Sequence, residues 1–98
     1  MKDLISGLNK TFDSRVRLGI MSVLMVNDSY DFISLKEALD VTDGNLASHL
    51  KALEEKNMLR VNKQFIGRKP NTSYSVTEEG RTAFSQHLRN LEDLIKAQ

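Results

Sequence analysis

The 98-residue chain carries a formal net charge of +1, with 28% charged residues, 40% hydrophobic residues and no cysteine. This composition is typical of one soluble globular domain and excludes an intrinsically disordered chain. The lack of cysteine excludes disulfides, thiolate metal sites and thiol catalysis. No stretch resembles a signal peptide, and the longest apolar run, residues 18–26, is too short to cross a bilayer. We therefore expect one cytoplasmic domain, residues 1–98, without membrane association.

The charges are unevenly distributed along the chain. Residues 42–72 contain six Lys or Arg against three Asp or Glu, a local charge of +3. Residues 1–41 contain five bases and six acids, and residues 73–98 contain three and four. For nucleic-acid binding the distribution of bases matters more than the net charge, and it favours the central segment.

Two helices are predicted before residue 27. Leu4, Ile5 and Leu8 have helical spacing and predict a short helix within residues 1–10. Asp13 or Ser14 is the predicted N-cap of a longer helix that runs to about residue 26. This longer helix is apolar on two faces, which predicts burial inside the domain or against a partner subunit. One face carries Val16, Ile20, Val23 and Leu24, and the other carries Leu18, Met21 and Met25.

A helix-turn-helix is predicted over about residues 34–57, after a very short strand within residues 30–33. Ser34 and Glu37 match a capping box, which opens the first helix of this unit. That helix is predicted to end near Asp40 in the left-handed conformation, which Asp tolerates better than most residues. Its predicted buried residues are Leu35, Ala38 and Leu39.

The second helix of the unit is predicted to follow an N-cap at Thr42 or Asp43. Leu46, Leu50 and Leu53, at positions i, i+4 and i+7, define its buried face. Its other faces are small and polar. They carry Gly44, Ser48, Lys51 and Glu55, with Asn45 and Ala52 to one side, His49 on the flank and Asn57 as the predicted left-handed end.

A β-hairpin is predicted over about residues 60–76. Residues 60–66 alternate in polarity and predict a strand. Residues 67–72, GRKPNT, are turn formers throughout, and residues 74–76 return as a second strand. The predicted turn carries two adjacent bases, Arg68 and Lys69.

A helix-turn-helix followed by a ribbon with a basic loop is the winged-helix arrangement, whose natural partner is double-stranded DNA. Asn45 offers a donor and an acceptor together, which suits adenine, and Ser48 can serve either role. Basic residues on the wing loop can reach phosphates or an adjacent minor groove. The predicted DNA-binding residues are Thr42, Asp43, Gly44, Asn45, Ser48, His49, Lys51, Arg68, Lys69 and Asn71.

Two runs also carry a family resemblance: LKEALDVTDGNLASHLKALEEKNMLRV, residues 35–61, and FIGRKPNTSYSVTEEGRTAF, residues 65–84. They resemble the small winged-helix transcriptional regulators of the MarR/ArsR-like group. The resemblance implies a homodimer that binds a pseudo-palindromic operator, usually as a repressor. It also implies that the helix from about Thr42 is the recognition helix. Asp40 and Asn57 stand where the family often has Gly, although both can adopt the left-handed conformation.

The sequence thus predicts an α+β, mostly α, winged helix-turn-helix with a three-helix core, a wing and terminal helices for dimerisation. A last helix, about residues 77–96, is capped by Thr77 and has an apolar stripe with spacing suited to packing against another helix. The predicted interface residues are Leu4, Leu8, Met21, Met25, Phe84, Leu88, Leu91 and Ile95.

Two other interpretations of this pattern do not involve DNA. A winged helix can serve as a protein-interaction module, and a plain helical hairpin needs no DNA. Ser48 and His49 are neighbours that point about 100° apart on a helix, so they form no nucleophile–base pair, and we expect no enzyme. His87 is predicted to be a solvated helix residue, and it lies on a different helix from His49, so no metal or other cofactor is expected. A small-molecule effector beside Met21 and Met25 is possible but not indicated.

Overall fold

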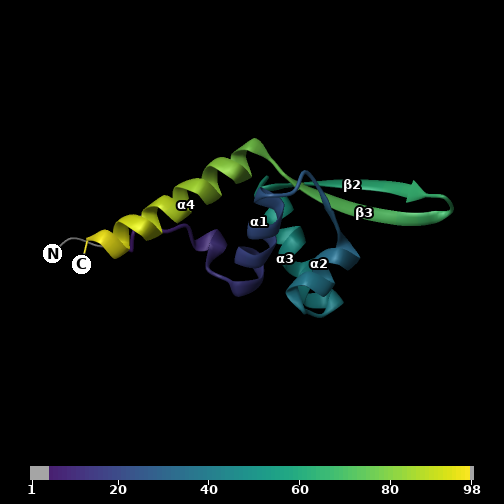
Figure 1. Ribbon diagram of the computed structural model, residues 1–98, viewed down its shortest axis with the longest axis horizontal. Helices are drawn as coiled ribbons and strands as arrows, with labels where there is room; N and C mark the ends of the chain where they lie inside the picture. Colours follow the sequence, from purple (N-terminus) through teal and green to yellow (C-terminus); the bar gives the residue numbers. More distant parts are fainter. Residues whose placement is uncertain (1–4, 98) are drawn as a thin grey trace.

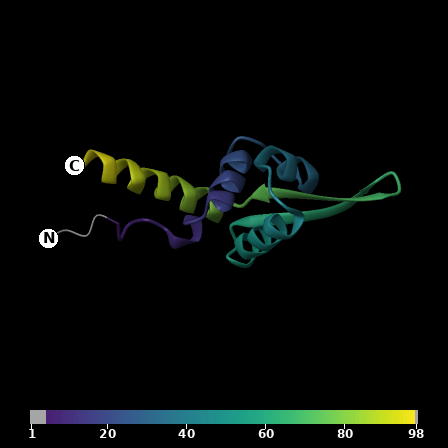
Figure 2. The same ribbon diagram turned by 90° about the horizontal axis from the view of Figure 1, so that it is seen from below.

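The computed structural model describes residues 5–97 as a helical body from which a wing and a long helix extend in opposite directions (Figure 1). Its principal extents are 59 × 26 × 21 Å, and Figure 2 shows the same extended arrangement from below. The elements in chain order are η1 (Lys10–Phe12), α1 (Arg15–Met25), β1 (Tyr30–Asp31), α2 (Phe32–Leu39), α3 (Asp43–Glu55), β2 (Leu59–Ile66), β3 (Lys69–Val76) and α4 (Glu78–Lys96).

The four α-helices begin at side-chain caps. The hydroxyls of Ser14, Thr42 and Thr77 accept hydrogen bonds from the backbone N–H groups three residues later, at the starts of α1, α3 and α4. These three caps confirm the prediction. The predicted cap of α2 at Ser34 is wrong. Asp31 is the N-cap, and its side chain accepts a hydrogen bond from the backbone N–H of Ser34.

The N-terminal region differs from the prediction. Residues 5–9 form turns and bends rather than a helix, and η1 follows with Asn9 as its cap. Leu4, part of the predicted helix and interface, lies outside the described residues. The backbone N–H of Asn9 donates to Nδ1 of His87, and the Asn90 side chain donates to the carbonyl of Gly7, so this segment follows α4.

The sheet has the strand order β1-β3-β2 and is antiparallel, with pairing from Leu59↔Val76 to Ile66↔Lys69. The predicted six-residue turn is wrong, since only Gly67 and Arg68 connect the strands. Gly67 has φ 65°, the left-handed conformation that a two-residue hairpin turn needs.

Pro70 can lie inside β3 because of its register. Ile66↔Lys69 closes the two-residue turn and is the hydrogen-bonded pair, so the next pair, Phe65↔Pro70, is not hydrogen-bonded. The missing N–H of Pro70 therefore removes no bond to β2, and β1 pairs only farther along β3, at Ser73 and Tyr74.

The core joins all the helices to the base of the sheet. Met21 and Phe84, two predicted interface residues, are 0% and 3% exposed and belong to this core, so that part of the prediction is wrong. Ala38 was predicted to be buried but is exposed. The buried core consists of Phe12, Ile20, Met21, Leu24, Leu35, Leu46, Leu50, Leu53, Leu59, Tyr74 and Phe84.

His87 is a buried residue and not the solvated one that was predicted. It is 8% exposed, and its ring lies 5.3 Å from that of Phe12 and 6.4 Å from that of Phe84. Since its Nδ1 accepts from Asn9, the imidazole closes the contact between the N-terminal segment and α4. Among the described residues, no helix combines the length and apolarity needed to span a membrane.

Candidate nucleic-acid interface

α3 is fixed to the body on one side and open on the other. Leu46, Leu50 and Leu53 are at most 2% exposed and anchor the helix in the core. The polar residues expected to contact bases and phosphates, Gly44, Asn45, Ser48 and Lys51, are all exposed, as is the cap Thr42. The structure thus brings these predicted residues together on one accessible helix.

The turn before α3 sets the direction of the helix. Asp40 has φ 52° and ends α2 in the left-handed conformation, as predicted, and Thr42 then caps α3 by accepting from the backbone N–H of Asn45 at 3.2 Å. Nothing lies within 4 Å of the position that a Cβ on Gly44 would take. Packing within the domain therefore does not require a glycine at position 44. Because Gly44 has no side chain, the first turn of α3 is unobstructed for a ligand.

Asp43 is the carboxylate next to the small and polar residues at the start of α3. It pairs with Lys36 of α2, with an Nζ–Oδ1 distance of 2.8 Å, and both side chains are largely solvated. Such an exposed pair contributes little to stability. It does place a cation beside Asp43, which reduces the repulsion that an approaching phosphate would meet.

His49 has a partner that the sequence did not reveal. Nε of Arg17 donates to Nδ1 of His49 at 3.0 Å, and the same guanidinium donates to the carbonyl of Thr11. Burial and, secondarily, the Arg17 charge lower the pKa of His49 below its ordinary 6.5. The imidazole is therefore neutral near pH 7, with its proton on Nε2, and can contact a phosphate as a neutral donor.

Arg17 is the residue that sequence reasoning missed. It lies on α1, 32 residues from His49, and no local pattern connects the two positions. The contact brings a guanidinium from another element to the flank of α3.

The wing places its polar residues differently from the predicted loop. Arg68 is in the turn, whereas Lys69 and Asn71 are strand residues on the same face of β3. Arg68 and Lys69 are exposed and Asn71 is half-buried. The two basic residues thus lie at the turn between β2 and β3, which is the far end of the wing (Figure 1).

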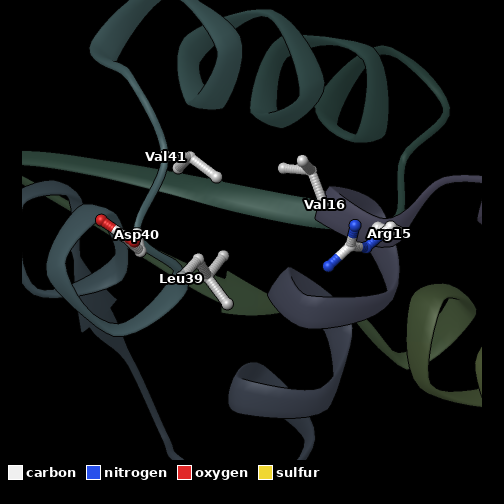
Figure 3. Close-up of a pocket in the computed structure, with 5 residues that line it drawn as sticks. All are labelled: Arg15, Val16, Leu39, Asp40 and Val41. Atoms are coloured by element: carbon white, nitrogen blue, oxygen red, sulfur yellow. The ribbon is translucent and has the colours of Figure 1, made fainter.

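A shallow depression of about 320 Å³ lies beside the α2–α3 turn (Figure 3). Its lining is mainly aliphatic, from Val16, Leu39 and Val41, and Arg15 and Asp40 stand on opposite sides of it. The part of the chain that the structure describes has no group of three or more His, Asp or Glu side chains placed to hold a metal.

Comparison with known proteins assigns this arrangement to a protein family. Residues 16–95 match the family model of the winged helix DNA-binding domain. The chain belongs to that family. This winged-helix chain is also 38% identical, over 87 residues, to an uncharacterised protein of Methanocaldococcus jannaschii, covering 89% of this chain and 95% of the relative.

Solved structures share the same winged-helix fold. A transcriptional regulator homologue from Pyrococcus horikoshii matches with a TM-score of 0.85 and 29% identity, covering 96% of this chain and 91% of that one. A protein from Enterococcus faecalis, assigned to the MarR family of transcriptional regulators, matches with a TM-score of 0.75 and 22% identity over 90% of this chain and 78% of that one. The predicted winged-helix fold class is confirmed, and so is the predicted resemblance to winged-helix DNA-binding regulators.

Proposed function

We propose that this chain is a DNA-binding transcriptional regulator that acts as a homodimer, as a repressor, on a pseudo-palindromic duplex site. One observation carries the proposal: α3 buries its leucines and exposes a small, polar face that holds Gly44, Asn45 and Ser48. Membership of the winged-helix family and the likeness to the P. horikoshii regulator homologue support DNA as the partner.

In this proposal α3 enters the major groove with its N-terminal half leading. Gly44 keeps the backbone close to the base edges, while Asn45 and Ser48 make the hydrogen bonds that read the sequence. Lys51, farther along the same exposed side, and His49, through Nε2, hold phosphates. Arg68 and Lys69 hold the phosphates that flank the half-site and fix the register of the protein on the duplex.

The second half of α4 supports a homodimer. Gly80, Phe84 and His87 are buried in the body, but the helix continues to Lys96, beyond the core. Apolar residues in this extension are exposed: Leu88 by 45%, Leu91 by 40% and Ile95 by 67%. Their spacing suits packing against a second helix, and a two-fold pair of chains would present two copies of α3 about one helical turn of DNA apart.

The deciding experiment selects bound sequences from a random duplex pool at two salt concentrations and then measures affinity for the selected site. We expect a two-fold symmetric consensus and an affinity that falls steeply with salt. Lys69→Ala should weaken binding to all sequences alike and reduce the salt slope by roughly one. Asn45→Ala should instead relax the preference at one base pair, by about 1–3 kcal/mol.

The second candidate is a winged-helix module that binds proteins without binding DNA. It predicts no salt-dependent affinity for duplex DNA and no enriched consensus. Either a selected pool that stays random or a salt slope that Lys69→Ala leaves unchanged would contradict the proposed contacts. The first result would exclude DNA as the partner, and the second would exclude only the contact between the wing and phosphates.

A further inference from the structure

The outer half of the wing carries two large apolar side chains that the domain does not bury. At the base of the wing, Leu59 is buried and Val61 packs against Tyr74 of the core. Farther out, every residue of β2 from 62 to 66 is exposed, and Phe65 and Ile66 are 72% and 63% exposed. Burying a Phe side chain stabilises a fold by about 1.5–3 kcal/mol, and little of that is realised here.

The strand register places these two side chains on opposite faces of the ribbon. Phe65 pairs with Pro70 and lies on the same face as Lys63, whereas Ile66 pairs with Lys69. Side chains alternate along a strand, so the Phe65–Pro70 pair continues the row that starts with the core contact Val61↔Tyr74. An exposed ribbon with apolar residues promotes aggregation unless a partner covers it.

The charge of this region indicates what that partner is. Residues 56–77 contain five Lys or Arg and no Asp or Glu. Of these bases, Lys63 lies on the same face of the ribbon as Phe65, Arg68 lies in the adjoining turn, and Lys69 lies on the face of Ile66. An exposed apolar ring on a ribbon that carries bases and no acids suits a polyanion with an apolar interior, which is what a base-paired duplex offers.

We propose that Phe65, backed by Pro70, inserts into the minor groove beside the half-site and partly unstacks a base step. Apolar side chains such as Phe and Pro act in this way in proteins that bend DNA through the minor groove. Lys63, Arg68 and Lys69 hold the phosphates on either side of the insertion. Flexible pyrimidine–purine steps are the easiest to unstack, so the wing reads deformability at positions that α3 does not contact. This inference rests on the proposed function.

The test compares Phe65→Ala with Ile66→Ala, because both side chains are exposed near the wing tip but lie on opposite faces. The probe is the selected duplex, with 2-aminopurine at the flanking step and a fluorophore pair at its ends. With Phe65→Ala we expect loss of the 2-aminopurine signal and of the bend, and about tenfold weaker binding with an unchanged salt slope. Ile66→Ala and Phe65→Leu should stay close to the wild type.

Equal behaviour of Phe65→Ala and Ile66→Ala, or wild-type bending by Phe65→Ala, overturns the insertion while leaving DNA binding intact. A wild-type chain without salt-dependent DNA affinity overturns the proposed function and the insertion with it. Thermal unfolding of each variant shows whether the fold is preserved, and truncation of an exposed side chain should change it little.

Discussion

Gly44 and Gly80 both lie in the first turn of a helix, but their surroundings are opposite. A Cβ on Gly80 would collide with the backbone carbonyl of Met58, because the start of α4 docks directly on that peptide. Backbone cannot move aside as a flexible side chain can. A Cβ on Gly44 would meet nothing within 4 Å. One glycine therefore serves packing, and the other leaves space at the proposed DNA-contacting surface.

We expect Gly80→Ala to lower the free energy of unfolding by about 1–3 kcal/mol, as overpacking does. Gly44→Ala should leave it unchanged or raise it by up to about 1 kcal/mol, since Ala is the better helix former. DNA affinity, by contrast, should be lost in Gly44→Ala although its fold is intact. Urea unfolding and binding to the selected duplex measure both quantities, and a destabilised Gly44→Ala would contradict the assignment.

His49 makes stability depend on pH. Its pKa is lowered in the folded state, so below pH 6.5 the unfolded chain binds a proton that the folded chain does not. Stability therefore falls as the pH drops through 6.5 towards the folded-state pKa. His49→Gln keeps an acceptor for Arg17 without a titrating group, so we expect a flatter profile between pH 7.5 and about pH 5. Urea unfolding at a series of pH values measures this, and identical profiles would exclude His49 as the cause.

Residue-scale prediction from the sequence succeeded where the signal is local. The leucines of α3 and the left-handed Asp40 and Asn57 follow from spacing and from the conformations that Asp and Asn tolerate. The contact between Arg17 and His49, and the burial of His87, depend on residues far apart in the chain. Neither position carries a pattern that would have indicated it.

The start of α2 shows how two good caps compete at the scale of an element. Asp31 and Ser34 are both favourable N-cap residues, and the sequence favours Ser34 because Glu37 completes a capping box. Tyr30 and Asp31, however, pair with β3, which leaves Asp31 in the extended conformation that an N-cap needs. Tertiary pairing therefore starts the helix one turn earlier.

We expect Asp31→Ala to lower the free energy of unfolding by about 1 kcal/mol, because the Ser34 N–H loses its acceptor. Ser34→Ala is the matched control and should change stability by less than about 0.5 kcal/mol. Chemical denaturation compares the two directly. A larger loss of stability for Ser34→Ala would show instead that Ser34 caps α2, as the capping box in the sequence indicates.

The length of the wing was underestimated from the sequence for a similar reason. Pro70, Asn71 and Thr72 are turn formers by composition, yet they lie in β3 because the two-residue turn at Gly67 and Arg68 already reverses the chain. Sequence composition marks where a turn is tolerated, whereas strand register decides where it occurs. The outcome is a longer wing whose bases are divided between the turn and the strand.

At the scale of the whole molecule, the extension of α4 is the proposed contact between subunits. Leu91→Glu should convert the dimer to a monomer with an intact fold, since Leu91 is 40% exposed and outside the core. Gln86→Glu is the matched control, because it adds the same charge at an exposed position about 140° around the helix. Light scattering at micromolar concentration measures the mass. A monomeric wild type, or monomers from both variants, would contradict this interface.

The connection between β3 and α4 has a mechanical consequence. Only Thr77 separates the two elements, and its hydroxyl bonds to the carbonyls of Asn57 and Met58 at 2.7 and 3.1 Å, so the joint has no hinge. In the proposed dimer each chain then behaves as a stiff lever. Rotation of the 19-residue α4 by about 10° at the interface would displace its far end by roughly 5 Å. The separation of the two α3 helices, and hence the length of DNA spacer that fits, would follow from one crossing angle.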